Sequence, residues 1–260
     1  MKNEQMSREI TSWLNPSDPS NNVNRARELR YARTGSWFIG SPAFNEWKSA
    51  SRRHLWLHGI PGCGKTVLTA TLFEHLNSMQ DCIVLTYFFD FNDAAKQDLD
   101  GVVRSLFFQL YKSSLDSSNE LTSLYESYRR VGIQPGTQTL QDSLFTAMAE
   151  NKRILILIDA IDECTTKTAL INCIEQLVFH PGLHQVQLIV TGRNEEPFLG
   201  RLPSCIGKEN CIALDTDCVN ADIQLYVEAR LSGPMLKKWA AFPDLQRRIQ
   251  IDIGHRADGM

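Results

Sequence analysis

The sequence predicts an α/β fold in which helices enclose a five-stranded, mostly parallel sheet in a three-layer αβα arrangement. Three observations predict it. Short runs rich in aliphatic and β-branched residues alternate with longer segments of helical periodicity, an order typical of parallel sheets. A glycine-rich octet follows the first apolar run, and acidic residues follow the third. With 260 residues, 43% of them hydrophobic, the chain is long enough for one sizeable core and a small second module.

The glycine-rich octet is the most specific motif in the chain. It spans 59–66, reads G-x-x-x-x-G-K-T, and lies between a predicted strand at 54–60 and a predicted helix that includes 67–73. This is the phosphate-binding P-loop pattern, or Walker A motif. Glycines at 62 and 64 let backbone N–H groups approach phosphate oxygens, and the following helix dipole favours the same anion. The alternative is a glycine turn between a strand and a helix that binds nothing. Such an octet can occur by chance, but the strand before it and the helix after it favour phosphate binding.

Two side chains of the octet have separate tasks at a phosphate site. Lys65 supplies positive charge for the β- and γ-phosphates, and the Thr66 hydroxyl is a ligand for Mg²⁺. Upstream, backbone groups of Thr34, Gly35 and Ser36 are candidates for contact with a base. The predicted binding residues of the octet and its continuation are Gly59, Ile60, Pro61, Gly62, Cys63, Gly64, Lys65, Thr66 and Val67.

The remaining elements follow in order along the chain. A continuous β-rich run at 82–89 indicates a strand that is buried on both faces. Residues 15–22 have turn and linker chemistry, and the arginines at 25, 27, 30 and 33 form a basic cluster, for which a solvated face is favoured over an arm that touches phosphates or a partner. Further strands are predicted at 153–158, 187–193 and 211–214, and helical stretches at 1–14, 44–47, 99–111, 121–128, 140–148, 167–179 and from 220 onward.

These elements predict three segments. Residues 1–50 form an N-terminal helical and linker segment that leads into the nucleotide site. Residues 51–218 form the nucleotide-binding core. Residues 219–260 begin a helical module, which we expect to be truncated at residue 260.

The third strand is followed by a second functional motif, with Walker B character. Asp159 ends an aliphatic run, and Asp162 and Glu163 follow within four residues. A carboxylate at this position can hold Mg²⁺, and the two later acids can polarise an attacking water. Ala160 is small enough to let phosphates approach. Adjacent carboxylates repel one another, so the cluster calls for a cation or a raised pKa.

Arg193 is the last residue of the fourth predicted strand. In a parallel sheet this position lies on the same edge as Gly59 and Asp159. The guanidinium group is suited to sensing or stabilising a γ-phosphate, and we favour that role. The alternative is a surface arginine that pairs with Glu195 or Glu196.

Composition excludes several classes of protein. The net charge of −3 gives no sign of a nucleic-acid binder. The seven cysteines contain no C-x-x-C pair, which favours reduced thiols over disulfides or a zinc site. The longest aliphatic run is too short to span a membrane, and the N-terminus has no apolar signal core. We therefore expect a cytoplasmic protein.

The P-loop at 59–66, the acid run at 159–163 and the Thr-Gly-Arg turn at 191–193 together resemble the NACHT domain, a STAND-class P-loop ATPase domain of NOD-like receptors. A small residue after the first acid and a further acidic pair match the NACHT form of that run. Three more stretches resemble fungal members of the group, which include heterokaryon-incompatibility receptors. These stretches are 34–37, 88–93 and 257–260, and the likeness spans residues 11–260.

The resemblance implies an AAA+-like P-loop NTPase that works as a nucleotide-operated switch. Exchange of a bound diphosphate for a triphosphate would permit oligomers that signal programmed cell death in an innate-immunity-like response. The implied cofactors are Mg²⁺ with ATP and ADP, or GTP and GDP. The implied partners are further copies of the full-length protein, an effector domain and a C-terminal repeat sensor. By motif, the site residues are Lys65 and Thr66 for phosphate and Mg²⁺, Asp159 for Mg²⁺, Asp162 and Glu163 for hydrolysis, and Arg193 as sensor.

Two other functions are consistent with the motifs. A P-loop nucleoside or small-molecule kinase would need an arginine-bearing lid and an acceptor pocket, neither of which is clear in the sequence. A non-catalytic module would bind nucleotide for structure alone.

Overall fold

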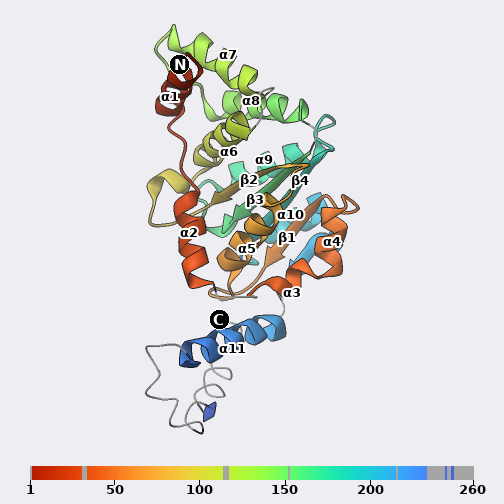
Figure 1. The fold of residues 1–260 in the computed structure, drawn as a ribbon. Helices are drawn as coiled ribbons and strands as arrows, with labels where there is room; N and C mark the ends of the chain where they lie inside the picture. The colour runs from red at the N-terminus through yellow and green to blue at the C-terminus, as the bar shows by residue number, and fades with distance from the viewer. Residues whose placement is uncertain are drawn as a thin grey trace.

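A five-stranded sheet lies at the centre of the computed structural model (Figure 1). The structure describes residues 2–30, 34–113, 117–151, 153–214 and 216–232, together with residues 244, 247 and 248. The sheet order is β2-β3-β4-β1-β5, and each neighbouring pair is parallel. The α/β P-loop NTPase fold predicted from the sequence is thereby confirmed. The strands are β1 (His54–His58), β2 (Ile83–Phe88), β3 (Ile154–Asp159), β4 (Val186–Gly192) and β5 (Cys211–Ala213).

Helices cover both faces of the sheet, as the side chains of β3 illustrate. Ile154, Ile156 and Ile158 pack in one apolar cluster, whereas Leu155 and Leu157 pack in a second cluster on the opposite face. This alternation follows from the twofold side-chain repeat of a strand. The helices are α1 (Lys2–Leu14), α2 (Ser20–Leu29), α3 (Ser36–Ile39), α4 (Pro42–Lys48), α5 (Lys65–Asn77), α6 (Leu99–Ser113), α7 (Ser117–Arg129), α8 (Thr137–Ala149), α9 (Lys167–Phe179), α10 (Phe198–Ile206) and α11 (Thr216–Ser232).

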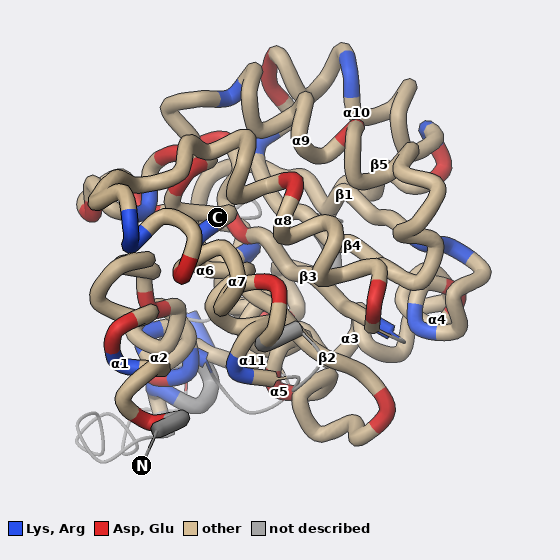
Figure 2. Tube along the Cα trace, turned by 90° about the horizontal axis from the view of Figure 1, so that it is seen from above, with Lys and Arg blue, Asp and Glu red and all other residues tan. Residues whose placement is uncertain are grey.

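Helix α2 was not predicted, because its sequence has the polar composition of a linker. It packs on α5, and Arg27 Nε and Arg30 Nη1 lie 2.6 and 2.5 Å from the carboxylate of Glu74. Part of the basic cluster is therefore paired with an acid of α5 rather than simply solvated. Figure 2 shows several basic positions along α2, among acidic and basic positions spread over many elements. Arg33 lies outside the described residues.

Helix α10 was also absent from the prediction. Pro203 lies inside it, and an internal proline normally indicates that a helix ends. Phe198, Leu202 and Ile206 are nevertheless buried in the larger apolar cluster, so tertiary packing outweighs the local signal.

The N-terminal segment contributes to the same core. Ile10 and Leu14 of α1 are fully buried in the cluster that covers one face of the sheet. The predicted segment boundaries at 50 and 218 stay predictions. The stretch at 257–260 lies outside the described residues, and so does the predicted helical module after residue 232, apart from residues 244, 247 and 248. None of the helices that the structure describes has the combination of length and apolar character needed to cross a membrane.

The first residue of β1 predicts a pH dependence of stability. His54 is buried, and in the described structure neither ring nitrogen has a hydrogen-bond partner. Burial lowers the pKa of His54 from 6.5 to about 4. Between these values the unfolded chain binds more protons than the folded one. The free energy of unfolding should therefore fall as the pH falls through that window, by up to about 3 kcal/mol.

Urea unfolding of the wild type and of His54→Leu at pH 7 and at pH 4.5 would measure this contribution. The variant should lose less stability between the two pH values, and His184→Gln, at an exposed position, should behave like the wild type. Equal pH dependence in the wild type and His54→Leu would contradict the assignment.

Candidate functional site

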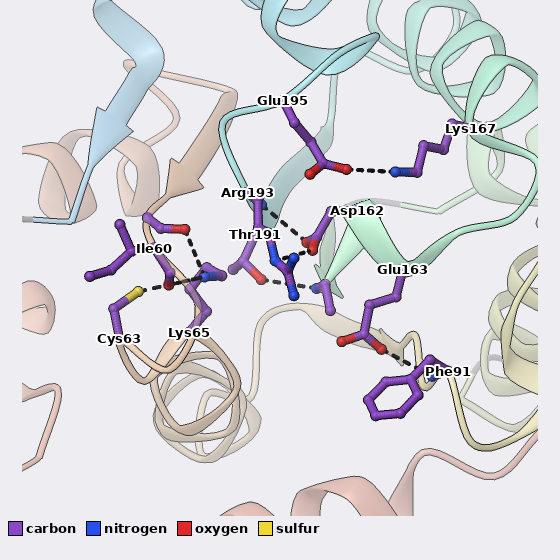
Figure 3. Close-up of polar contacts among 12 residues, drawn as sticks. Ile60, Cys63, Lys65, Phe91, Asp162, Glu163, Lys167, Thr191, Arg193 and Glu195 are labelled. Carbon is purple, nitrogen blue, oxygen red and sulfur yellow. Dashed lines mark hydrogen bonds and ion pairs between the residues drawn. The ribbon is translucent and has the colours of Figure 1, made fainter. Parts of the chain in front are cut away.

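Three neighbouring strands bring the predicted site residues to one edge of the sheet. Strand β4 lies between β1 and β3, and His58 pairs with Gly192 at the carboxyl end of β1. The P-loop, the acids after β3 and Arg193 therefore meet at this edge, as Figure 3 shows. The prediction that Arg193 shares an edge with Gly59 and Asp159 agrees with this arrangement.

The P-loop wraps around its own lysine. Gly62 and Gly64 have φ values of 79° and 83°, a left-handed conformation that strains residues with a Cβ, and α5 begins immediately afterwards at Lys65. The Lys65 ammonium group donates to the carbonyl oxygens of Gly59 at 2.9 Å and Ile60 at 2.8 Å. The loop thus presents a positive charge and a helix N-terminus together, which suits a phosphate chain.

Asp159 is buried beneath the start of α5 and accepts three hydroxyl hydrogen bonds. Thr66 donates to Oδ2 at 2.6 Å, and Thr69 and Thr191 donate to Oδ1 at 2.9 and 2.6 Å. Burial nevertheless raises the pKa of Asp159, although these hydroxyls and Lys65 act in the opposite direction. A cation would restore the ionised form that burial disfavours. Thr66 and Asp159 supply oxygen ligands of the kind that Mg²⁺ takes, so the residues fit this ion.

The two remaining acids have different partners. Asp162 lies 3.0 Å from the Arg193 Nε and accepts from the Arg193 backbone N–H at 3.1 Å. Arg193 thus pairs with Asp162 and with neither Glu195 nor Glu196. Glu163 accepts from the backbone N–H of Phe91 at 3.0 Å. Its pKa is raised, first by burial and then by nearby acids that include Asp162 and Asp159. A carboxylate with a raised pKa suits general-base chemistry near neutral pH.

Thr191 completes the site, although its role was not predicted. Its hydroxyl donates to Asp159 and also accepts from the Ala160 N–H at 3.1 Å. Ala160 has φ 57°, so the chain leaves β3 in a left-handed turn that this hydrogen bond supports. The adjacent Gly192 leaves no room for a side chain, because a Cβ would lie 2.7 Å from Ile161 Cγ1. The Thr-Gly-Arg motif at 191–193 contains both residues, but the hydrogen-bond partners of Thr191 and the close contact at Gly192 are visible only in the fold.

A cavity of about 230 Å³ adjoins the P-loop. Thr34 and Gly35 line this cavity, whereas Ser36 is not among its lining residues, and contact of these residues with a base stays a prediction. Asp222 of α11, which was not among the predicted site residues, also lines the cavity and accepts from the Gly35 N–H. The other described lining residues are Trp37, Gly62, Cys63, Gly64, Val67, Leu68, Leu214, Val219, Ile223 and Tyr226.

Comparison with known proteins identifies the family. The family model described as Nephrocystin 3, N-terminal, matches residues 33–193, which is more than half of the chain. The chain belongs to this family. The matched region contains all the predicted site residues, from Thr34 to Arg193.

One curated protein and one solved structure are similar to the chain. The vegetative incompatibility protein HET-E-1 of Podospora anserina is 24% identical over 136 residues, which are 50% of this chain and 10% of that protein. This chain therefore spans about a tenth of that relative. The structure of Cdc6p from Pyrobaculum aerophilum has a TM-score of 0.45 and 14% identity, over 71% of this chain and 46% of that one.

The family match and the relative support the resemblance seen in the sequence. The chain is a NACHT-type protein with a P-loop NTPase fold. It is thereby related to nucleotide-binding proteins of the NTPase type.

The contacts of Thr191 predict a specific loss of stability. Thr191→Val keeps the shape of the side chain but leaves the Ala160 N–H and Asp159 Oδ1 each one partner short. The free energy of unfolding should drop by about 1–3 kcal/mol. Thr86→Val on β2 is the matched control, because the buried Thr86 hydroxyl has no hydrogen-bond partner in the described structure.

Urea unfolding of both variants would test this difference. Thr86→Val should be neutral or stabilising. Equal losses in the two variants would show that the hydroxyl of Thr191 contributes nothing beyond its shape.

Proposed function

We propose that the chain is a nucleotide-operated switch that binds ATP with Mg²⁺ and hydrolyses it slowly. The observation that carries the proposal is the contact of 2.6 Å between Thr66 of the P-loop and Asp159 of β3. It joins a phosphate-binding motif to the acid that would share its metal ion. A divalent cation at this point would neutralise phosphate charge. GTP and GDP are the alternative nucleotides.

In this proposal each group at the edge has one task. The loop from Gly59 to Val67 surrounds the phosphates with backbone N–H groups, and Lys65 turns from its carbonyl partners to the β- and γ-phosphates. Glu163 accepts a proton from the attacking water, supported by its raised pKa. Arg193 senses the γ-phosphate, and Asp162 contributes to hydrolysis by holding the Arg193 guanidinium group in position.

The wider role is also proposed. A NACHT-type switch of this kind would control self-association and signalling in innate-immunity-like programmed cell death, in the cytoplasm, within a longer protein that carries an effector domain and a repeat sensor. Residues 51–218 would form the switch core, with 1–50 and 219–260 as flanking segments. The similarity to a vegetative incompatibility protein supports this direction. A P-loop kinase is the competing hypothesis, and triphosphate turnover that depends on an added acceptor would favour it.

Phosphate binding is tested at Lys65. Lys65→Ala removes a charge-assisted contact worth about 1.5–3 kcal/mol. The affinity for ADP with Mg²⁺ should fall roughly tenfold to a hundredfold in a calorimetric titration. Lys208→Ala, an exposed lysine that precedes β5 at the opposite edge of the sheet, should bind like the wild type. Unchanged affinity in Lys65→Ala would overturn the proposed phosphate site.

Hydrolysis is tested at Glu163. Glu163→Gln keeps the acceptor for Phe91 N–H but lacks the proton-accepting carboxylate. Nucleotide affinity should change little, while the single-turnover rate should drop by about 10²–10⁴-fold. Because the pKa of Glu163 is raised above the ordinary value of a glutamate, the wild-type rate should rise with pH as Glu163 ionises. This rise should be absent in Glu163→Gln. The exposed Glu150→Gln serves as the control, and a wild-type rate in Glu163→Gln would assign the base elsewhere.

A further inference from the structure

Among the described residues, Lys96 is the one lysine that the fold buries, with 6% of its surface exposed. It lies in the segment between β2 and α6, outside the residues predicted to bind nucleotide. Its Nζ donates to Asn22 Oδ1 of α2 at 2.6 Å and lies 3.7 Å from Asp93 Oδ2. Burying an ammonium group costs free energy unless it is paired and hydrogen-bonded. The contacts that satisfy Lys96 therefore show which parts of the fold it joins.

Lys96 and Asn22 attach the loop at 90–96 to α2. The Lys96 carbonyl accepts from the Asp90 N–H at 3.3 Å, and the Lys96 N–H donates to the Asp93 carbonyl at 2.8 Å. Asn22 makes a second, longer contact with the loop, 3.5 Å from its Nδ2 to Asp90 Oδ2. One side chain of α2 thus contacts both the start and the end of the loop.

The same loop carries the backbone N–H of Phe91, which donates to Glu163 at 3.0 Å (Figure 3). The Phe91 side chain is 68% exposed, so packing of its ring does little to fix this N–H. Gln97 Nε2 instead donates to the Phe91 carbonyl at 2.6 Å, and the Gln97 carbonyl accepts from the Thr165 N–H at 2.7 Å. Polar contacts therefore hold the loop on two sides, through Gln97 towards the turn after β3 and through Lys96 towards α2.

We propose that Lys96 is a positioning residue for nucleotide hydrolysis: by anchoring the loop at 90–97 to Asn22 of α2, it holds the Phe91 N–H against Glu163. This inference rests on the proposed function, in which Glu163 accepts a proton from the attacking water. A fixed donor on one carboxylate oxygen limits the ways in which the carboxylate can turn away from that water. Helix α2 thereby acts on the base through two side chains, neither of which touches the nucleotide.

Loss of the anchor should affect Glu163 in a defined direction. Burial raises the pKa of Glu163, the Phe91 N–H lowers it, and the acids Asp162, Asp159 and Asp90 raise it again. A loosened loop weakens the contact with Phe91 and leaves the other influences in place. The pKa of Glu163 should then rise further, so hydrolysis should begin to increase at a higher pH. General destabilisation of the fold would lower the rate without moving that pH.

Single-turnover hydrolysis of ATP with Mg²⁺ over a pH series compares the wild type with Asn22→Leu, which removes the acceptor for Lys96 from a half-buried position. The midpoint of the rise in rate should move up by about half a unit to one unit, which lowers the rate below the midpoint by roughly threefold to tenfold. The affinity for ADP should not change. Asn22→Asp keeps an acceptor for the ammonium group and should restore the midpoint. Asn21→Leu makes the same replacement at the exposed neighbouring position and should match the wild type.

Lys96→Met is a second variant, which keeps the apolar part of the side chain and removes the ammonium group. It should shift the midpoint in the same direction as Asn22→Leu. A wild-type midpoint in whichever of these two variants folds, with or without a lower rate, would refute the positioning role, and so would an equal shift in Asn21→Leu. A wild type that does not hydrolyse ATP, or Glu163→Gln with the wild-type rate, would refute the proposed function itself.

Discussion

The carboxylate of Asp159 lies beneath the P-loop among three threonine hydroxyls, two from α5 and one from β4. Each hydroxyl offsets part of the cost of burying an acid, and together they link three elements that are far apart in the sequence. Because Thr66 is the last residue of the P-loop motif, this carboxylate also fixes the distance between the phosphate-binding loop and the acids that follow β3. The other groups at the carboxyl edge of the sheet are placed relative to the P-loop and these acids.

Three acids crowd this edge, and the protein stabilises each one differently. Asp159 is held by hydroxyl groups, Asp162 by the guanidinium and backbone N–H of Arg193, and Glu163 by one backbone N–H. Within the described residues, Asp162 is the one acid of the three that has an ion-pair partner. Burial raises the pKa of both Asp159 and Glu163, and at Glu163 the neighbouring acids raise it further. The repulsion that the sequence spacing predicts is therefore present as a contribution to the raised pKa of Glu163.

Local patterns were sufficient to predict the strands, most helices and the P-loop, since periodicity and glycine spacing depend on neighbouring residues. Contacts between distant segments were not accessible in this way. Helix α2 forms ion pairs with Glu74 of α5, and α10 continues through Pro203 because its apolar face is buried. The hydrogen bond between Gly35 and Asp222 joins residues 187 positions apart, and no local sequence pattern at either residue predicts it.

Helix α5 takes part in two separate parts of the structure, one at each end. Its first residue is Lys65, at the phosphate-binding loop, while Glu74 near its other end anchors α2. One helix therefore carries the phosphate-binding loop at its start and the ion pairs to α2 near its end, so the N-terminal segment is held by the same element that presents Lys65.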